Sequence, residues 1–279
     1  MKTLRNACTL HLCLMSGLLL FGCRDTSVEQ DAPDIAVTNS YLESVVYDLC
    51  GRQTKVLCLA PPGMCPGHFD IAPAQVTQLQ NCRMLLLFDF QAQVESTLAR
   101  LKNKGLQMHL VKGPTGLCVP DSYLGVCREV AAILASAHPE GADALTLRLG
   151  EIEQRLAGLS GEMRESVVEA GLASAPVLTS HHQAQFVAWL GLEAVATFVG
   201  SDTETVGSID HCLKQAAGAD VRFVVANQQE GTALAQALAE RLDTEAVVFS
   251  NFPAQAVDGP GFDRLVRDNV ERLLKAGAE

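Results

Sequence analysis

The run MLLLF at residues 84–88 constrains the fold most, because it places five apolar side chains in succession. A strand with one face in water alternates apolar and polar residues, whereas a strand covered on both faces is continuously apolar. The run therefore predicts a strand of a parallel sheet with helices on both sides.

Short β-rich runs alternate with helical runs around this strand. The first half of the chain predicts strands at 35–38, 55–59, 83–90 and 106–111, and helices at 41–50, 74–81 and 94–104. Gly51 is expected to end the first helix, since glycine adopts a left-handed cap at little cost. This βαβα order predicts one parallel α/β lobe.

The middle of the chain is different, because residues 123–171 contain no strand signal. Apolar residues recur there at mostly helical spacing, which predicts a long helical spine. Alternation then resumes, with strands expected at 175–179, 193–199, 221–226 and 246–249, and helices at 182–190, 208–217, 231–241 and 262–275. The fold class is therefore α/β, with two parallel-sheet lobes joined by a helical spine, and each lobe is expected to keep its own core.

The N-terminus has the features of a secretory signal peptide. Lys2 and Arg5 precede an apolar stretch that ends in Leu-Phe-Gly-Cys at residues 20–23. Cys23 after Leu-Phe-Gly is similar to the bacterial lipobox, in which this cysteine carries the lipid; a plain secreted protein is the alternative. The predicted divisions are a signal peptide at 1–22, a lipidated tether at 23–34, an N-terminal lobe at 35–122, the spine at 123–172 and a C-terminal lobe at 173–279.

The net charge is −11, and removing Lys2 and Arg5 with the signal peptide leaves −13. Nucleic acids and anionic lipids require clustered basic residues. The charge therefore argues against a nucleic-acid partner, and attachment to the membrane is expected through the lipid anchor alone.

Seven cysteines remain after export and lipidation. Four of them, Cys50, Cys58, Cys65 and Cys82, lie close together in the first lobe. An oxidising compartment favours disulfides, so at least one bridge is expected among these four.

The sequence contains no GxSxG, no P-loop, no GxGxxG after the first strand and no HExxH motif, so we expect a binding protein rather than an enzyme. The candidate residues follow strands, where open α/β sheets bind ligands. His68 and Cys65 lie in a loop rich in Pro and Gly, and His181 and His182 end the strand at 175–179. Imidazole and thiolate are zinc ligands. A loop histidine beside a disulfide cysteine is the alternative for His68.

Cys118 and Asp121 precede the helical middle of the chain. A carboxylate there can ligate a cation. It can equally stabilise the start of a helix, where aspartate is favoured.

Three segments together resemble a known family. They are VTNSYLESVVYDLCG with the following KVLCLAPPGMCPGHFDIAPAQVTQLQNC, then APVLTSHHQAQFVAWLGLEAVATF, and finally GFDRLVRDNVERLLKA with its Arg267 and Asn269. In this order they resemble the metal-binding solute receptors of bacterial zinc and manganese ABC importers, over residues 35–276.

This resemblance implies a metal site in a cleft between two lobes. His181 matches the family's Ser-His motif, whereas Gly67 stands at the usual position of the first histidine and His68 follows one residue later. Asp121 occupies the position of the middle histidine, and Ser250 that of the late carboxylate. The implied ligands are His181, His68 and Asp121, with Cys65, Cys118, His182, Ser250 and Asn251 as candidate additional ligands.

The resemblance also implies the function. We expect an extracytoplasmic, lipid-anchored, monomeric receptor that binds zinc, or less favourably manganese, and delivers the ion to a membrane permease. The departures in the ligand set leave a second hypothesis open. In it the scaffold has lost transition-metal binding and acts as a lipoprotein that binds another ligand or partner.

Overall fold

The computed structural model describes residues 33–60, 71–91, 105–200, 206–254 and 259–278. The predicted signal peptide, nearly all of the tether, the loop that carries Cys65 and His68, and the helix expected at 94–104 lie outside these ranges. Within the described part of the chain, no helix is long and apolar enough to cross a membrane.

The first sheet contains four parallel strands in the order β2-β1-β3-β4. Its elements are β1 (Ile35–Val37), α1 (Ser40–Cys50), β2 (Val56–Cys58), α2 (Pro73–Leu79), β3 (Met84–Phe88), η1 (Asp89–Gln91) and β4 (Gln107–Val111). Gly51 ends α1 with φ +84°, as the sequence predicts.

The second sheet repeats this topology, with four parallel strands in the order β6-β5-β7-β8. Its elements are β5 (Pro176–Ser180), η3 (His181–Gln183), α6 (Ala184–Trp189), β6 (Glu193–Phe198), α7 (Val206–Ala216), β7 (Phe223–Asn227), η4 (Gln228–Glu230), α8 (Ala233–Leu242), β8 (Glu245–Phe249) and α9 (Gly261–Gly277). The predicted α/β class with two parallel sheets is confirmed.

The apolar run at β3 is buried along its whole length. Leu85 and Leu87 pack toward Leu79 of α2, while Leu86 and Phe88 belong to the core that contains α1 and α4. Both faces of the sheet are therefore covered, which explains why the strand has no polar residue.

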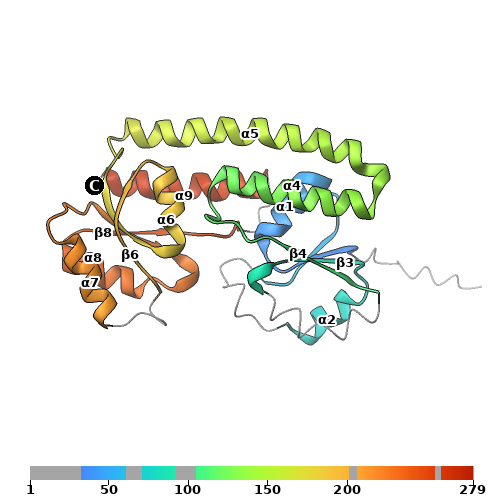
Figure 1. Cartoon of the computed structure of the whole chain (residues 1–279), viewed down its shortest axis with the longest axis horizontal. Helices are drawn as coiled ribbons and strands as arrows, with labels where there is room; N and C mark the ends of the chain where they lie inside the picture. The colour runs from blue at the N-terminus through green and yellow to red at the C-terminus, as the bar shows by residue number, and fades with distance from the viewer. Residues whose placement is uncertain (1–32, 61–70, 92–104, 201–205, 255–258, 279) are drawn as a thin grey trace, which may run out of the picture. The chain divides into compact units, whose positions relative to one another are not determined.

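The predicted helical spine is formed by two helices. These are α4 (Pro120–Ala137) and α5 (Ala142–Glu169), with the 3₁₀ turn η2 (Pro139–Gly141) between them. A helix of 28 residues such as α5 is about 42 Å long. Figure 1 shows α5 extending beside α4 and beside α9, the closing helix of the second half.

Each sheet packs a core of its own on one face, as the sequence predicts, but on the other face a larger core continues between the two halves. One cluster of buried residues includes Leu86 of the first sheet and Val225 of the second. Within it the ring of Tyr123 on α4 stacks on Phe262 of α9 at 4.0 Å between centroids. Because these aromatic side chains fill one shared core, the two sheets are expected to unfold together.

The described cysteines are free thiols. Cys50, Cys58 and Cys82 are among them, so these three do not form the disulfide predicted for the first half, and Cys65 lies outside the described ranges. The remaining described thiols, Cys118, Cys127 and Cys212, are buried.

Candidate functional site

Polar side chains gather at the carboxyl ends of the strands in the second sheet. Ser180 ends β5, Gln183 follows it in η3, Asn227 ends β7, and Asn251 lies just beyond β8; all four are buried. The carboxyl ends of parallel strands meet at one edge of the sheet, which is where open α/β sheets bind ligands.

Three amides of this group form a hydrogen-bonded cluster. The side-chain nitrogen of Gln183 donates to Oδ1 of Asn251 at 3.0 Å and to Oδ1 of Asn227 at 3.4 Å. The Oε1 atom of Gln183 is buried and accepts no hydrogen bond from the described residues. The three amides are neutral, and beside them Nδ2 of Asn227 donates to the carboxylate of Glu230 at 3.2 Å.

Cys118 and Asn269 hold the loop after β8 from two sides. The thiol of Cys118 donates to the carbonyl oxygen of Ser250 at 3.0 Å. The side chain of Asn269 accepts from the Ser250 nitrogen and donates to its carbonyl oxygen, both at 2.9 Å. The position of Asn251 at the site is therefore set by side chains from α9 and from the segment before α4.

A cavity of about 290 Å³ lies in front of the amide cluster. One wall is the loop at residues 114–117, which connects β4 to α4, and the other includes His181, His182 and Asn251. The walls approach closely, because a Cβ added to Gly116 would lie 2.8 Å from Cβ of Gln185. The cavity therefore lies between segments from the two halves of the chain.

The two histidines stand side by side at this cavity. Their ring centroids are 5.9 Å apart and the rings are roughly perpendicular. Both residues are exposed, so their imidazoles are accessible to an ion from solvent. Imidazole is a good ligand for zinc, and this pair is the strongest ligand group at the cavity.

Of the other predicted ligands that the structure describes, only Asn251 lines this cavity. Asn251 lines the cavity, Cys118 and Ser250 are buried behind it, and Asp121 is exposed in the first turn of α4 without lining it. His68 and Cys65 lie outside the described residues. In the described ranges no three His, Cys, Asp or Glu side chains are grouped to hold a metal ion.

Cys118 has the chemistry of a structural thiol. Burial raises its pKa far above the usual value, and the Asn269 amide only partly offsets this rise. The thiol is therefore protonated at neutral pH, whereas a metal ligand must be a thiolate. In this conformation Cys118 supports the loop after β8 rather than binding an ion.

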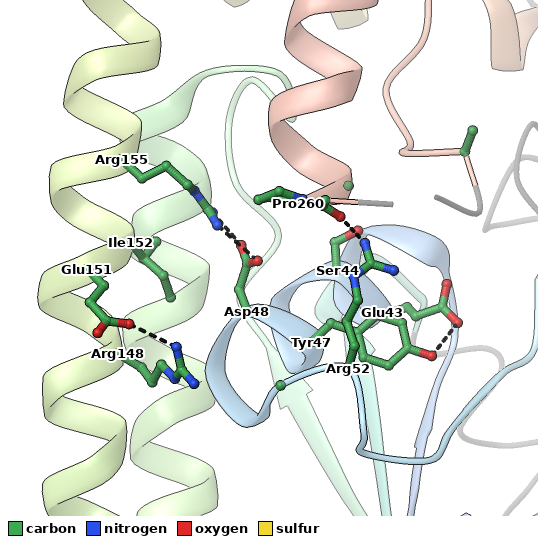
Figure 2. A pocket seen from close by; sticks show the side chains of 14 residues that line it. Glu43, Ser44, Tyr47, Asp48, Arg52, Arg148, Glu151, Ile152, Arg155 and Pro260 are labelled. Atoms are coloured by element: carbon green, nitrogen blue, oxygen red, sulfur yellow. Dashed lines mark hydrogen bonds and ion pairs between the residues drawn. The ribbon is translucent and has the colours of Figure 1, made fainter. Parts of the chain in front are cut away.

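A second cavity, of about 890 Å³, lies away from the strand ends. It is bordered by α1, α5 and residues 259–261, and Figure 2 shows Arg155 extending from α5 to Asp48 on α1. The charged groups at this cavity pair with one another, as in the contact of Arg148 with Glu151 at 2.9 Å. The Arg155–Asp48 pair connects α5 to α1, whereas the Arg148–Glu151 pair lies within α5, and we assign the cavity no ligand.

The sequence of the chain matches a known protein family. The model of the family described as zinc-uptake complex component A, periplasmic (ZnuA), matches residues 119–276, which is more than half of the chain. The chain belongs to this family. Members of the ZnuA family are periplasmic receptors of metal-uptake systems and are not enzymes. No curated protein matches the chain closely in sequence.

Solved structures show the same fold. The Mn-bound periplasmic metal-binding protein from Candidatus Liberibacter asiaticus has a TM-score of 0.73 at 12% identity, covering 87% of this chain and 98% of that one. A ZnuA crystal structure has a TM-score of 0.69 at 16% identity, covering 88% and 100%. A ZnuA mutant that lacks residues 138–173 and has zinc bound gives 0.69 at 16%, covering 88% and 98%.

Sequence reasoning missed several residues of the site. Gln183 was read only as part of a helix, and Asn227 and Glu230 received no role. Their signal was available in principle, because the segment ANQQE directly follows the apolar strand FVV. Polar residues at that position in a parallel sheet are site candidates by topology alone.

Proposed function

We propose that this chain is the extracytoplasmic receptor of an ABC importer for a divalent transition metal, with zinc preferred over manganese. His181 and His68 are the principal ligands, and Asp121 is a third. The receptor carries the ion to a membrane permease and is held at the membrane through a lipid on Cys23.

The observation that carries this proposal is the position of His181. It lies at the carboxyl end of β5, lines the 290 Å³ cavity between segments from the two halves, and is exposed. Membership of the ZnuA family, whose members serve metal uptake, supports an ion as the ligand of this cavity. In the sequence, His68 follows β2. The carboxyl end of β2 lies at the edge of the first sheet where the strands end, as the carboxyl end of β5 does in the second sheet.

Calorimetric titration of zinc and manganese into the chelator-stripped mature protein tests the proposal. Loss of one ligand should weaken binding at least tenfold, or about 1.4 kcal/mol, so His181→Ala and His68→Ala should both bind more weakly than wild type. His211→Ala is the matched control, because His211 is an exposed histidine on α7 that does not line the cavity. A wild-type Kd above about 1 mM for both ions, which is a binding free energy of about −4 kcal/mol, would contradict the proposal.

The second hypothesis, a scaffold without transition-metal binding, is favoured by one specific observation. The buried cluster of Gln183, Asn227 and Asn251 presents neutral amides, and Ser250 stands where a carboxylate is expected. Amides serve to hydrogen-bond an organic ligand and are poorer zinc ligands than carboxylates. Metal content of the purified protein by mass spectrometry separates the two hypotheses, since this one predicts no bound zinc or manganese.

A further inference from the structure

Glu230 occupies a central place among the strand ends. It closes η4 after β7, and its side chain is only 16% exposed. Its Oε2 atom accepts from the hydroxyl of Ser180 at 2.5 Å and from Nδ2 of Asn227 at 3.2 Å. Its Oε1 atom accepts from the backbone nitrogen of Gly200 at 3.4 Å. The carboxylate is thus held by the ends of β5, β6 and β7.

Glu230 also packs closely against Gly200. A Cβ added to Gly200 would lie 2.7 Å from Cβ of Glu230 and 3.2 Å from its carbonyl oxygen. Real Cβ atoms do not approach so closely, so residue 200 must lack a side chain for Glu230 to lie here. The base of the Glu230 side chain is therefore placed by this close packing, and its carboxylate by hydrogen bonds.

One further group contacts this carboxylate, the imidazole of His182. Its Nε2 atom lies 3.3 Å from Oε1 of Glu230. The backbone nitrogen of His182 also donates to the hydroxyl of Ser180, at 3.2 Å. Both the backbone and the ring of His182 are thereby fixed by the pair Ser180–Glu230, although the ring is 56% exposed.

The neighbouring His181 has no such support. The described residues give its ring no hydrogen-bond partner, and its contact there is with the ring of His182. Both histidines line the same cavity. The two rings therefore differ: that of His182 is held through one nitrogen, whereas the described residues give the ring of His181 no such contact.

A histidine that ligates a metal almost always donates its second ring N–H to a carboxylate, a carbonyl group or water, and this contact fixes the tautomer and raises the basicity of the ligating nitrogen. We propose that Glu230 is a positioning residue that holds His182 by its Nε2–H and leaves Nδ1 as a ligand for the divalent metal. This inference rests on the proposed function and adds His182 to the ligands at the cavity.

Zinc titration into four proteins tests the inference: wild type, Glu230→Gln, His182→Ala and the double variant. Removing such a carboxylate contact typically lowers metal affinity by 10- to 100-fold. We expect this loss for Glu230→Gln, at least a tenfold loss for His182→Ala, and a double variant that binds no more weakly than His182→Ala alone. The control Glu240→Gln changes an exposed carboxylate on α8 and should bind as wild type does.

Whether the losses of zinc affinity in Glu230→Gln and His182→Ala add up in the double variant distinguishes a positioning role of Glu230 from a structural one. If Glu230 only stabilised the fold, Glu230→Gln would lower affinity equally with and without His182, and that result would overturn the inference. His182→Ala decides the question even if Glu230→Gln unfolds, because the exposed ring can be removed without a cavity in the core.

The outcomes also distinguish this inference from the function on which it rests. If wild type binds no zinc, both are overturned. If wild type binds zinc and His182→Ala binds equally well, the receptor function stands and the role of Glu230 is refuted. The ligand-field spectrum of cobalt(II) bound in place of zinc gives a second readout, which should change in His182→Ala and remain unchanged in Glu240→Gln.

Discussion

Arg155 on α5 binds both carboxylate oxygens of Asp48 on α1, at 3.1 Å and 2.5 Å. The hydroxyl of Tyr123 donates to the same carboxylate at 2.8 Å, and Nε of Arg155 lies 3.2 Å from Asp263 at the start of α9. Burial lowers the pKa of Arg155, but the hydrogen bond and the charge of Asp48 outweigh this effect and raise the pKa overall. This network connects the helix of the first sheet, the spine and the closing helix.

Removal of this cation should therefore destabilise the whole fold. In Arg155→Met the Asp48 side chain, which is 8% exposed, stays buried with only Tyr123 as a partner. Breaking a buried pair from one side costs about 3 kcal/mol. Urea unfolding followed by circular dichroism measures the loss, and a single cooperative transition is expected because the core is shared.

Arg128→Met is the matched control for this experiment. Arg128 on α4 pairs with Glu153 on α5 at 3.1 Å, but both side chains are more than half exposed. An exposed pair contributes about 0.5 kcal/mol. Equal losses in the two variants would show that the Asp48–Arg155 pair contributes no more than a surface pair.

The second prediction is that replacing Asn269 on α9 destabilises the fold. Asn269→Ala leaves the buried N–H of Ser250 without its side-chain partner, and the Ser250 carbonyl keeps the Cys118 thiol but loses the Asn269 amide. An unsatisfied buried polar group costs about 1–3 kcal/mol, so we expect a loss of about 2 kcal/mol or more in the free energy of unfolding. Asn81→Ala, at an exposed asparagine after α2, should change it by less than about 0.5 kcal/mol. A thermal melt that gives the same midpoint for both variants would contradict this role of Asn269.

The sequence predicted the sheets because their signals are local. The five apolar residues at 84–88 and the glycine at residue 51 each determine a strand or a helix end through their own chemistry. The division of the spine at 138–141 was less visible, since Pro139 can either break a helix or begin one.

The site was predicted only in part, because its contacts are not local. His181 was predicted from its place at the end of a strand, and the structure places it at the cavity. Glu230 was not found, since Ser180, Gly200 and Asn227 meet it from three strand ends whose register no single segment encodes. Sequence patterns indicate on which face of a helix or strand a side chain lies. Contacts between residues 30 to 50 positions apart depend in addition on the order of the strands in the sheet, which the patterns do not give.

Buried thiols should make the fold sensitive to alkali. Burial raises the pKa of Cys58 to about 12 and that of Cys82 to about 11, from 9.0, and nearby carboxylates add to both shifts. The unfolded chain thus loses these protons near pH 9 while the folded chain retains them. Stability is therefore unaffected below pH 9 and falls as the pH rises from 9 to about 12.

The measurement is the free energy of unfolding at pH 7, 9 and 10.5. Wild type should lose stability above pH 9, and Cys58→Val should lose less over the same interval because one of the titrating groups is absent. Identical slopes in the two proteins would assign the alkaline loss to other groups, such as the buried Tyr41 and Tyr123, whose pKa values burial also raises.

Lipidation at Cys23 is the prediction for the N-terminal segment. The apolar stretch ends in Leu-Phe-Gly-Cys, so cells given a clickable fatty acid should label the wild-type protein. Cys23→Ser should remain unlabelled and appear in the soluble extracytoplasmic fraction. Cys13→Ser is the control within the apolar stretch, and equal labelling of wild type and Cys23→Ser would refute the anchor.

The final prediction concerns the cysteines of the folded domain. The sequence predicts a disulfide among them, whereas the described cysteines are free thiols in the structure. Cys50 is exposed, whereas Cys118 and Cys127 are buried and burial raises the pKa of both thiols. Partial burial raises the pKa of Cys50 as well, but its thiol is accessible, so native protein at pH 8 should be modified faster at Cys50 than at the buried Cys118 or Cys127. Unfolding without reductant should then expose the thiols of all six described cysteines to alkylation, as counted by intact mass. A count that rises by two on addition of reductant would instead establish a disulfide, and peptide mapping would show whether Cys65 takes part in it.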